Sequence, residues 1–311
     1  MSKLGRGILP AVLLLVLTGC ASRGGFLPPS GEPLAGLPEA QLPRVAVGDK
    51  LYFSNGRREW VVGFSDDKVQ WKRTGQRSYT RSSNFLIPDI AWDNRTRKGV
   101  HLMDIEKDIL WPLQAGNSAS FSVRMSYLNK ENGSRRMYDR QWRCEVDDTE
   151  RMSVYAGTFD TYRIVCERYS LKGNLSQRRI WHYAPEIEQF ISRWDDYPGR
   201  RIAYLELTAY QPYVNGMDKK WKRNYWNHLR RAMERYPSGE KLNWYDKESD
   251  TLVSITPVRT VKSADGKYCR NYRLNITLKG QARNGAGMVC RDRKGYWKIP
   301  KSIRQDSGIH L

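Results

Sequence analysis

Two cysteines near the C-terminus constrain the fold of this chain more than any other feature. Residues 268–278, YCRNYRLNITL, alternate between a mainly apolar and a mainly polar face, as a β-strand requires. If the chain reverses at Lys279-Gly280, Cys269 lies opposite Cys290 at a non-hydrogen-bonded position, where a disulfide can close across the strands. A reversal at Asn284-Gly285, a favoured hairpin dipeptide, would leave both thiols unpaired. We therefore expect the first register.

The same register sets a bare glycine, Gly287, against the large side chain of Tyr272. A Cys269–Cys290 bridge would close a loop of about 22 residues and stabilise the fold by roughly 3 kcal/mol. A zinc site is the competing interpretation of these cysteines. Because the chain has no CxxC pair and only four histidines, we expect neither a metal site nor a cofactor.

The N-terminus has the layout of an export signal. Basic residues precede an apolar stretch from Ile8 to Leu17, which is shorter than the about 20 residues of a membrane-spanning helix. The sequence Leu17-Thr18-Gly19-Cys20 resembles the lipobox of bacterial lipoproteins. The resemblance implies that residues 1–19 are removed as a signal peptide and that Cys20 carries a diacylglycerol and an N-terminal acyl chain such as palmitate. A plain secretory peptide with an incidental cysteine is the alternative.

Acylation of Cys20 would decide where the protein resides. Stable anchoring takes more than one acyl chain, because each buried methylene contributes only about 0.8 kcal/mol. Ala21 and Ser22 follow the cysteine, and by resemblance to enterobacterial sorting rules the absence of aspartate favours the outer membrane. We therefore expect a protein anchored to the outer membrane that faces the periplasm.

The cysteine count agrees with an anchored Cys20. Setting it aside leaves Cys144, Cys166, Cys269 and Cys290, an even number in a compartment where disulfides persist. Four cysteines allow three connectivities. Their positions in the sequence favour two local bridges, one between Cys144 and Cys166 and one between Cys269 and Cys290.

The formal charge of +20 favours an anionic neighbour. In a cell envelope the candidates are lipopolysaccharide phosphates, anionic lipid headgroups and peptidoglycan carboxylates. A solvated basic surface without a specific partner is the alternative. Nucleic acid is not expected as a partner, since export removes the chain from the cytoplasm and no nucleic-acid-binding motif is present. With 40% hydrophobic residues and eleven Trp, the chain can bury real cores.

The rest of the sequence predicts a mainly β fold with two antiparallel β domains joined by an amphipathic helix. Residues 20–43 are rich in Pro and Gly without apolar periodicity, which predicts a flexible tether. Residues 44–213 show short alternating runs between turn residues, which predict an antiparallel β domain, either a curved sheet or a barrel. In SFSVRMSYL, every second residue from Phe121 to Tyr127 falls on one face. Residues 214–311 predict a helix followed by a small β domain.

The predicted helix has one apolar stripe and is otherwise thick with Lys and Arg. Trp221, Tyr225, Leu229 and Met233 recur at four-residue intervals, and Pro237 ends the pattern. Such a basic amphipathic helix can lie on an anionic membrane surface. The alternative, which we favour, is that the stripe packs on the neighbouring β structure.

Two segments resemble known families. SVYAGTFDTYRIVCERY, followed by RRIWHYAPEIEQFISR, resembles poorly characterised periplasmic β-proteins, which implies a curved sheet. The C-terminal 75 or so residues resemble the surface-antigen family of bacterial outer-membrane lipoproteins, through a helix, SGxxxxW, YCRxY and GxxCRxxxGxWxI. The residues that carry this resemblance are Ser238, Gly239, Trp244, Tyr268, Cys269, Arg270, Tyr272, Gly287, Cys290, Arg291, Gly295, Trp297 and Ile299. Family members often carry a glycine zipper, which this chain lacks, so a pore-like role is not implied.

We do not expect an enzyme, because no GxSxG, HExxH or phosphate-binding glycine loop is present and no catalytic residue can be named. The acid pairs Asp66-Asp67, Asp147-Asp148 and Asp195-Asp196 are interpreted as turn residues. We expect a lipid-anchored envelope protein with a structural or binding role. The alternative is a periplasmic lipid or lipoprotein carrier with an apolar cavity in residues 44–213.

Overall fold

The computed structural model describes residues 29–200, 202–214, 217, 219–262, 266–278 and 280–303. The predicted signal peptide and Cys20 lie outside these residues. Within these ranges the structure is mainly β, with one α-helix, and confirms the predicted fold class. No helix in the described ranges is both long and apolar enough to cross a membrane.

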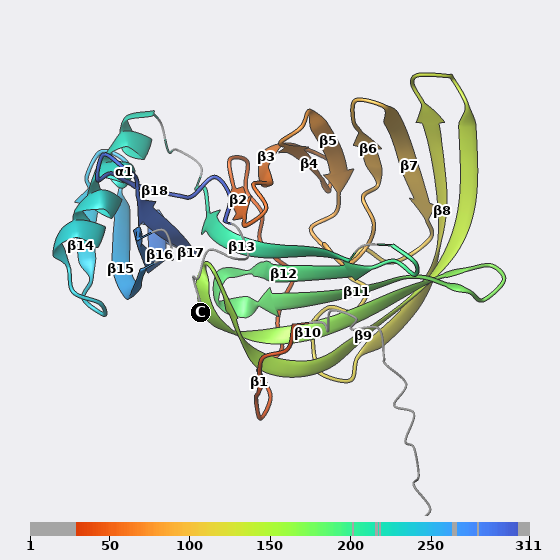
Figure 1. Cartoon of the computed structure of the whole chain (residues 1–311), viewed down its shortest axis with the longest axis horizontal. Helices are drawn as coiled ribbons and strands as arrows, with labels where there is room; N and C mark the ends of the chain where they lie inside the picture. Colours follow the sequence, from red (N-terminus) through yellow and green to blue (C-terminus); the bar gives the residue numbers. More distant parts are fainter. Residues whose placement is uncertain are drawn as a thin grey trace, which may run out of the picture.

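Twelve antiparallel strands, β2 to β13, form a closed barrel in which each strand pairs with its neighbours in sequence (Figure 1). The barrel closes where β13 pairs with β2, with Tyr210 opposite Leu51. The strands are β2 (Lys50–Phe53), β3 (Arg58–Ser65), β4 (Lys68–Arg73), β5 (Arg77–Arg81), β6 (Ala91–Asp93), β7 (Arg97–Met103), β8 (Ser118–Asn129), β9 (Arg135–Val154), β10 (Gly157–Ser170), β11 (Leu175–Ala184), β12 (Gln189–Asp196) and β13 (Ala203–Gln211), with the short helix η1 (Pro185–Ile187) between β11 and β12.

Part of the barrel is filled by an apolar core. The loop between β5 and β6 carries Phe85, whose ring lies 5.1 Å from Trp181 and 5.4 Å from Phe190 between ring centres. Leu86 of the same loop and Leu113 of the loop between β7 and β8 are also fully buried in this core. Aromatic edge-to-face packing of this kind stabilises beyond the area buried. Loop residues therefore plug one part of the barrel, while another part remains hollow.

The N-terminal segment packs against the barrel and its core, so the prediction of a flexible tether is wrong for residues 31–43. Strand β1 (Glu32–Pro33) pairs with β9, and Tyr162 donates a hydrogen bond to the carbonyl oxygen of Pro38 over 2.6 Å. A Cβ at Gly31 would lie 2.4 Å from the carbonyl oxygen of Arg151, so only glycine allows this approach. The Pro and Gly content that predicted flexibility here serves close backbone docking.

The C-terminal residues form a second antiparallel sheet covered by the single α-helix (Figure 1). Its elements are α1 (Lys219–Arg235), β14 (Leu242–Asp246), β15 (Thr251–Lys262), β16 (Tyr268–Leu278), β17 (Gln281–Arg291) and β18 (Trp297–Lys298). The apolar stripe of α1, including Leu229 and Met233, is buried against Val253 and Ile255 of β15. The stripe is therefore occupied by packing within this sheet and is not available to a membrane surface.

The hairpin of β16 and β17 has the register expected from its cysteines. Cys269 pairs with Cys290, Tyr272 pairs with Gly287, and the chain reverses around Gly280, which has a φ of 76°. Both disulfides are present: Cys144–Cys166 between β9 and β10, and Cys269–Cys290 between β16 and β17.

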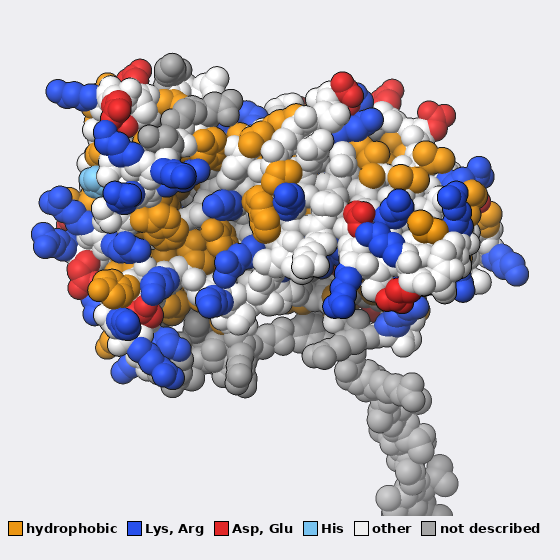
Figure 2. Space-filling view, turned by 90° about the horizontal axis from the view of Figure 1, so that it is seen from above, with side chains coloured by type: hydrophobic (Ala, Val, Ile, Leu, Met, Phe, Trp, Pro, Cys, Tyr) orange, Lys and Arg blue, Asp and Glu red, His pale blue; other side chains and the backbone are white. Residues whose placement is uncertain are grey.

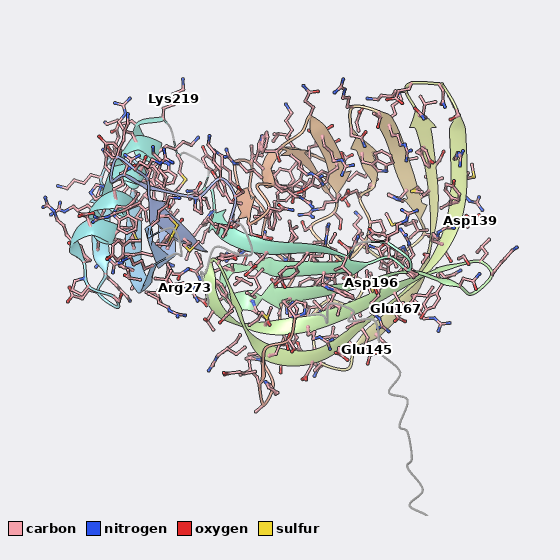
Figure 3. All side chains as sticks on the ribbon, in the orientation of Figure 1. Asp139, Glu145, Glu167, Asp196, Lys219 and Arg273 are labelled. Carbon is pink, nitrogen blue, oxygen red and sulfur yellow. A yellow bond between two sulfur atoms is a disulfide. The ribbon has the colours of Figure 1, made fainter. Side chains whose placement is uncertain are left out.

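The two sheets are joined through their strands as well as through the chain. Ala209 and Tyr210 of β13 pair with Gly287 and Ala286 of β17. Arg273 of β16 reaches the barrel, where its Nη2 donates to the Thr158 carbonyl oxygen over 2.6 Å (Figure 3). No local pattern in the sequence predicts this shared edge, since it pairs strands about 75 residues apart.

Candidate anion-binding cavity

The hollow part of the barrel is a cavity of about 620 Å³ with a wall rich in arginine. Among the residues that the structure describes, ten arginines line it, together with a single acidic residue, Asp89. The arginines come from the loop before β3, from β4, β5, β7 and β9 to β12, and from the turn that follows β12. They are Arg57, Arg73, Arg77, Arg81, Arg97, Arg140, Arg168, Arg179, Arg193 and Arg200.

Strand alternation brings arginines and aromatic rings to the same interior face. Arg140, Trp142 and Cys144 are alternate residues of β9, so their side chains point to one side of the sheet. On β10, Arg168 pairs with Trp142 and Cys166 pairs with Cys144. The buried Cys144–Cys166 disulfide therefore lies on the same face as the cavity residues Trp142 and Arg168, two residues along each strand. It links β9 and β10, two strands of the cavity wall.

Only part of the positive charge in the cavity is neutralised. Glu59, which is fully buried, pairs with Arg57. Asp195 pairs with Arg179 over 2.5 Å and with Arg193 over 2.8 Å. Within the described ranges, no carboxylate forms an ion pair with the other lining arginines, namely Arg73, Arg77, Arg81, Arg97, Arg140, Arg168 and Arg200.

Burial and mutual repulsion act on these guanidinium groups. Burial, followed by the neighbouring charges of Arg57 and Arg77, lowers the pKa of Arg73 to about 10. Burial and the neighbouring Arg179 lower the pKa of Arg193 to about 10. Both groups remain protonated at neutral pH, so the cavity holds several positive charges in a poorly solvated space. An anion that enters gains strong attraction there, because a partly buried pair is weakly screened.

Aromatic rings hold several of the unpaired arginines. The guanidinium carbon of Arg81 lies 4.5 Å from the ring centre of Trp71, that of Arg97 lies 5.3 Å from Tyr127, and that of Arg140 lies 5.1 Å from Tyr138. Such cation–π contacts use the face of the guanidinium and none of its N–H donors. Arg140 Nη1 donates to the carbonyl oxygen of Asp139 over 2.8 Å. The remaining N–H groups can bind a carboxylate or phosphate, which the planar fork holds in a bidentate manner.

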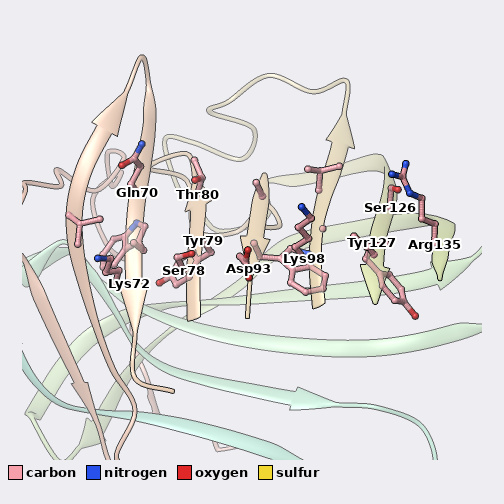
Figure 4. Close-up of a pocket in the computed structure, with 17 residues that line it drawn as sticks. Gln70, Lys72, Ser78, Tyr79, Thr80, Asp93, Lys98, Ser126, Tyr127 and Arg135 are labelled. Atoms are coloured by element: carbon pink, nitrogen blue, oxygen red, sulfur yellow. The ribbon is translucent and has the colours of Figure 1, made fainter. Parts of the chain in front are cut away.

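A second hollow, of about 630 Å³, lies across strands β3 to β9 (Figure 4). Its charged lining residues include Lys72, Lys98, Arg135 and Asp93. Asp93 forms an ion pair with Lys130 at 2.5 Å. On the outer surface, Lys and Arg side chains are scattered over the face seen in Figure 2. Three arginines of the C-terminal helix, Arg230, Arg231 and Arg235, line a further hollow together with Glu234. The cavity in the barrel has more lining arginines than either of these two hollows.

The cavity corrects two interpretations made from the sequence. The alternative of an apolar cavity for a lipid carrier is wrong in that form, since guanidinium groups line the cavity from most of its strands. Asp195 is not a turn residue either: it lies in β12, is 2% exposed, and pairs with two arginines. Only Asp66-Asp67 of the three acid pairs lies in a turn.

Two short stretches of the sequence carry a signal for this site. Arginines alternate with aromatic residues in YDRQW (138–142) and in RRIW (178–181), so that Arg140 shares a face with Trp142, and Arg179 with Trp181. Alternation alone does not say whether that face points to solvent or to the inside of a barrel. Among the described residues, no group of three or more His, Cys, Asp or Glu is placed to hold a metal.

The C-terminal sheet is similar to a known family of proteins. The family model described as 17 kDa outer membrane surface antigen matches residues 231–298, from the last turn of α1 to β18. This is the family that the residues of the C-terminal hairpin predict. The arginine-lined barrel lies outside the matched residues.

Particular relatives come from rickettsiae. The 17 kDa surface antigen of Rickettsia conorii is 30% identical over 84 residues, which are 27% of this chain and 53% of that protein. The corresponding antigen of Rickettsia bellii is 29% identical over 84 residues. The chain thus spans about half the length of the curated relatives it matches. Among solved structures, the hypothetical lipoprotein YmcC from Escherichia coli aligns with 57% of this chain and 91% of its own, at 9% identity and a TM-score of 0.38.

Proposed function

We propose that this chain is a lipid-anchored protein of the bacterial cell envelope whose barrel binds an anionic envelope component. The observation that carries the proposal is the cavity, in which ten arginines face one acidic lining residue. Pockets of roughly 300–1,000 Å³ suit small ligands, and this one has about 620 Å³. The ligand candidates are those named from the charge alone: phosphates of lipopolysaccharide, anionic lipid headgroups and carboxylates of peptidoglycan.

The envelope location rests on two supports. One is the lipobox ending at Cys20, and the other is the similarity of residues 231–298 to an outer membrane surface antigen family. Gly31 is the eleventh residue after Cys20, so an extended chain reaches at most about 40 Å between them. We therefore place the barrel close to the outer membrane, on its periplasmic side.

Binding rather than catalysis is the role we propose for the cavity. Asp89 is its one acidic lining residue, and burial raises the pKa of that carboxyl. Burial lowers the pKa of His101, so its imidazole is neutral at pH 7.

The location is tested by fractionating cells that express the wild-type chain or a Cys20→Ala variant. Wild-type protein is expected in the outer-membrane fraction and the variant in the soluble periplasmic fraction. A variant that stays with the membrane would refute the anchor.

Anion binding is tested by thermal unfolding of the Cys20→Ala chain in the presence of tripolyphosphate or citrate. A ligand at 100 times its dissociation constant stabilises by about 2.7 kcal/mol, so the midpoint should rise by several degrees. The Arg73→Gln/Arg77→Gln double variant should lose most of this rise. The exposed Arg259→Gln change is the matched control and should retain it. Equal stabilisation of all three proteins would show that the cavity is not the site.

A further inference from the structure

The helix α1 carries a row of cations on the side that faces away from the C-terminal sheet. Its apolar stripe is buried against the sheet, and 3.6 residues per turn place six basic side chains on the opposite side, with one acidic side chain, Glu234, among them. Figure 3 shows Lys219, at the start of α1, pointing away from the sheet. We call the six residues the basic face of α1: Lys219, Lys220, Arg223, Arg230, Arg231 and Arg235.

Most of the charge on the basic face is not neutralised within the protein. Glu234 is already engaged, because its two carboxylate oxygens accept from Arg291 Nη2 over 2.6 and 2.7 Å, and Oε2 also accepts from Trp297 Nε1 over 2.9 Å. Lys220 pairs with Glu248 over 2.5 Å. In the described part of the chain, no carboxylate pairs with the other five cations of the face. Their charge is therefore available to a partner outside the protein.

The first cations of α1 lie where they destabilise the helix. The N-terminus of an α-helix carries a partial positive charge, so basic side chains in the first turn are unfavourable there. Lys219, Lys220, Lys222 and Arg223 are nevertheless among the first five residues of α1, and its first turn contains no acidic residue. The stability of the fold does not account for this placement. A layer of negative charge outside the helix would offset its cost, and local rules are commonly broken at functional positions.

The distribution of the cations restricts the kind of partner. Lys219 and Arg235 are 16 positions apart, which is about 24 Å of helix, so a single small anion reaches only a few of the cations between them. The centre of a protein–protein interface is depleted in charge and rich in aromatic residues. However, α1 contributes none of the large hydrophobic side chains that are exposed in the described structure. The basic face therefore matches an extended anionic surface better than a small anion or a protein.

Resting on the proposed envelope location, we propose that the basic face of α1 docks on the anionic headgroups of a phospholipid membrane. The attachment is electrostatic, because the apolar stripe of the helix is buried in the sheet and is not available for insertion. This surface is separate from the cavity, whose lining residues belong to the barrel and its loops. Figure 2 shows Lys and Arg side chains over its left part, where the C-terminal sheet lies. Each cation near an anionic membrane strengthens binding about fivefold, so the contacts together give a measurable affinity.

Co-sedimentation of the Cys20→Ala chain with lipid vesicles measures the docking. Vesicles of phosphatidylcholine are compared with vesicles that also contain phosphatidylglycerol, which adds negative charge to the surface. The chain is expected to bind only the vesicles with phosphatidylglycerol. Binding should fall steeply as the ionic strength rises to about 0.5 M, where the Debye length is below about 5 Å. Equal binding to both kinds of vesicle, or binding that salt does not weaken, would refute electrostatic docking.

A triple variant isolates the contribution of the basic face. Arg223→Gln/Arg231→Gln/Arg235→Gln removes three exposed cations, and the helix should stay folded because Gln and Arg have similar helix propensities. Vesicle binding is expected to weaken by roughly a hundredfold, about fivefold for each cation. The matched control removes the same charge from exposed positions of the barrel and should weaken binding by less than about fivefold. This control is Lys68→Gln/Arg95→Gln/Lys172→Gln.

The outcomes separate docking through α1 from the function on which it rests. If the two triple variants weaken binding equally, the net charge of the chain is responsible and the inference fails. Vesicle binding that is lost in the Arg73→Gln/Arg77→Gln variant instead would assign headgroup binding to the cavity. Binding to isolated peptidoglycan but not to vesicles, lost in the α1 variant, would replace the membrane with peptidoglycan. The Cys20→Ala fractionation and the stabilisation by tripolyphosphate test the proposed function without involving α1.

Discussion

Arg283 and Asp49 form a buried ion pair between residues 234 positions apart in the sequence. Nη2 of Arg283 lies 2.9 Å from Oδ2 of Asp49, whose side chain is fully buried. Arg283 belongs to β17 of the C-terminal sheet, and Asp49 directly precedes β2 of the barrel. Tyr210 of β13 also donates to Asp49, over 3.2 Å. The pair therefore connects the C-terminal sheet to the strands that close the barrel.

Replacing Arg283 with methionine is expected to lower the free energy of unfolding by about 3 kcal/mol, because it leaves the buried Asp49 carboxylate without its counter-charge. Urea denaturation of the Cys20→Ala chain measures the effect. The exposed Arg259→Met change should alter stability by less than about 0.5 kcal/mol. A double Arg283→Met/Asp49→Asn variant should recover part of the loss. If Arg283→Met is as stable as the control, the pair does not hold the two sheets together.

Glu206 should make stability depend on pH. Burial raises its pKa to about 7, and its carboxylate accepts only a 3.2 Å hydrogen bond from the Tyr155 N–H among the contacts in the described chain. Because the folded pKa exceeds the unfolded value, the folded state binds more protons in this window. Stability contributed by the protonated group is therefore present below about pH 4.5 and is lost as pH rises through about 7.

The Glu206→Gln variant should not lose stability as the pH rises through about 7, because it has no carboxyl group to ionise at this position. It should match the wild type at pH 4 and exceed its free energy of unfolding by roughly 2–3 kcal/mol at pH 8. Denaturation curves at several pH values measure the difference, with the exposed Glu240→Gln change as the control. A difference that is constant across this range would contradict the assignment.

The arginines of the cavity should reduce the stability of the empty protein. Since burial and the charges of Arg57 and Arg77 lower the pKa of Arg73, its charged form is disfavoured in the folded state at any pH below about 10. Arg73→Gln is therefore expected to raise the free energy of unfolding by roughly 1–2 kcal/mol at low salt, and by less at high salt, where the repulsion is screened. The same variant should bind anions more weakly. A loss of stability in the absence of ligand would show that Arg73 has a structural role instead.

Gly287 should be irreplaceable at the shared edge of the two sheets. A Cβ there would lie 2.7 Å from the Ala209 Cβ and 2.8 Å from the Tyr272 Oη. Gly287→Ala is expected to cost about 1–3 kcal/mol, because it forces β17 away from β13. Thermal unfolding measures this, with the exposed Ala282→Ser change on the same strand as the control. Equal unfolding midpoints for the two variants would show that β17 accommodates the added methyl group without loss of stability.

Several local features follow from the sequence by itself, because they depend on periodicities of the chain. Period-two alternation puts Phe121 and Val123 of β8 on one buried face. The positions of Cys269 and Cys290 fix the register of the C-terminal hairpin. A four-residue spacing defines the buried stripe of α1. Each of these needs only neighbours along the chain or across one turn.

The docking of the N-terminal segment and the closure of the barrel were decided by tertiary structure, because they depend on contacts between residues far apart in the sequence. The docking of residues 31–43 depends on a close approach of Gly31 to Arg151, about 120 positions away in the sequence. The barrel closes through Tyr210 and Leu51, and only this closure turns a face of arginines and aromatic rings into the wall of a cavity. On an open sheet the same arginines would be solvated surface charges. Their proximity, and with it the proposed site, exists because strands distant in sequence enclose one poorly solvated space.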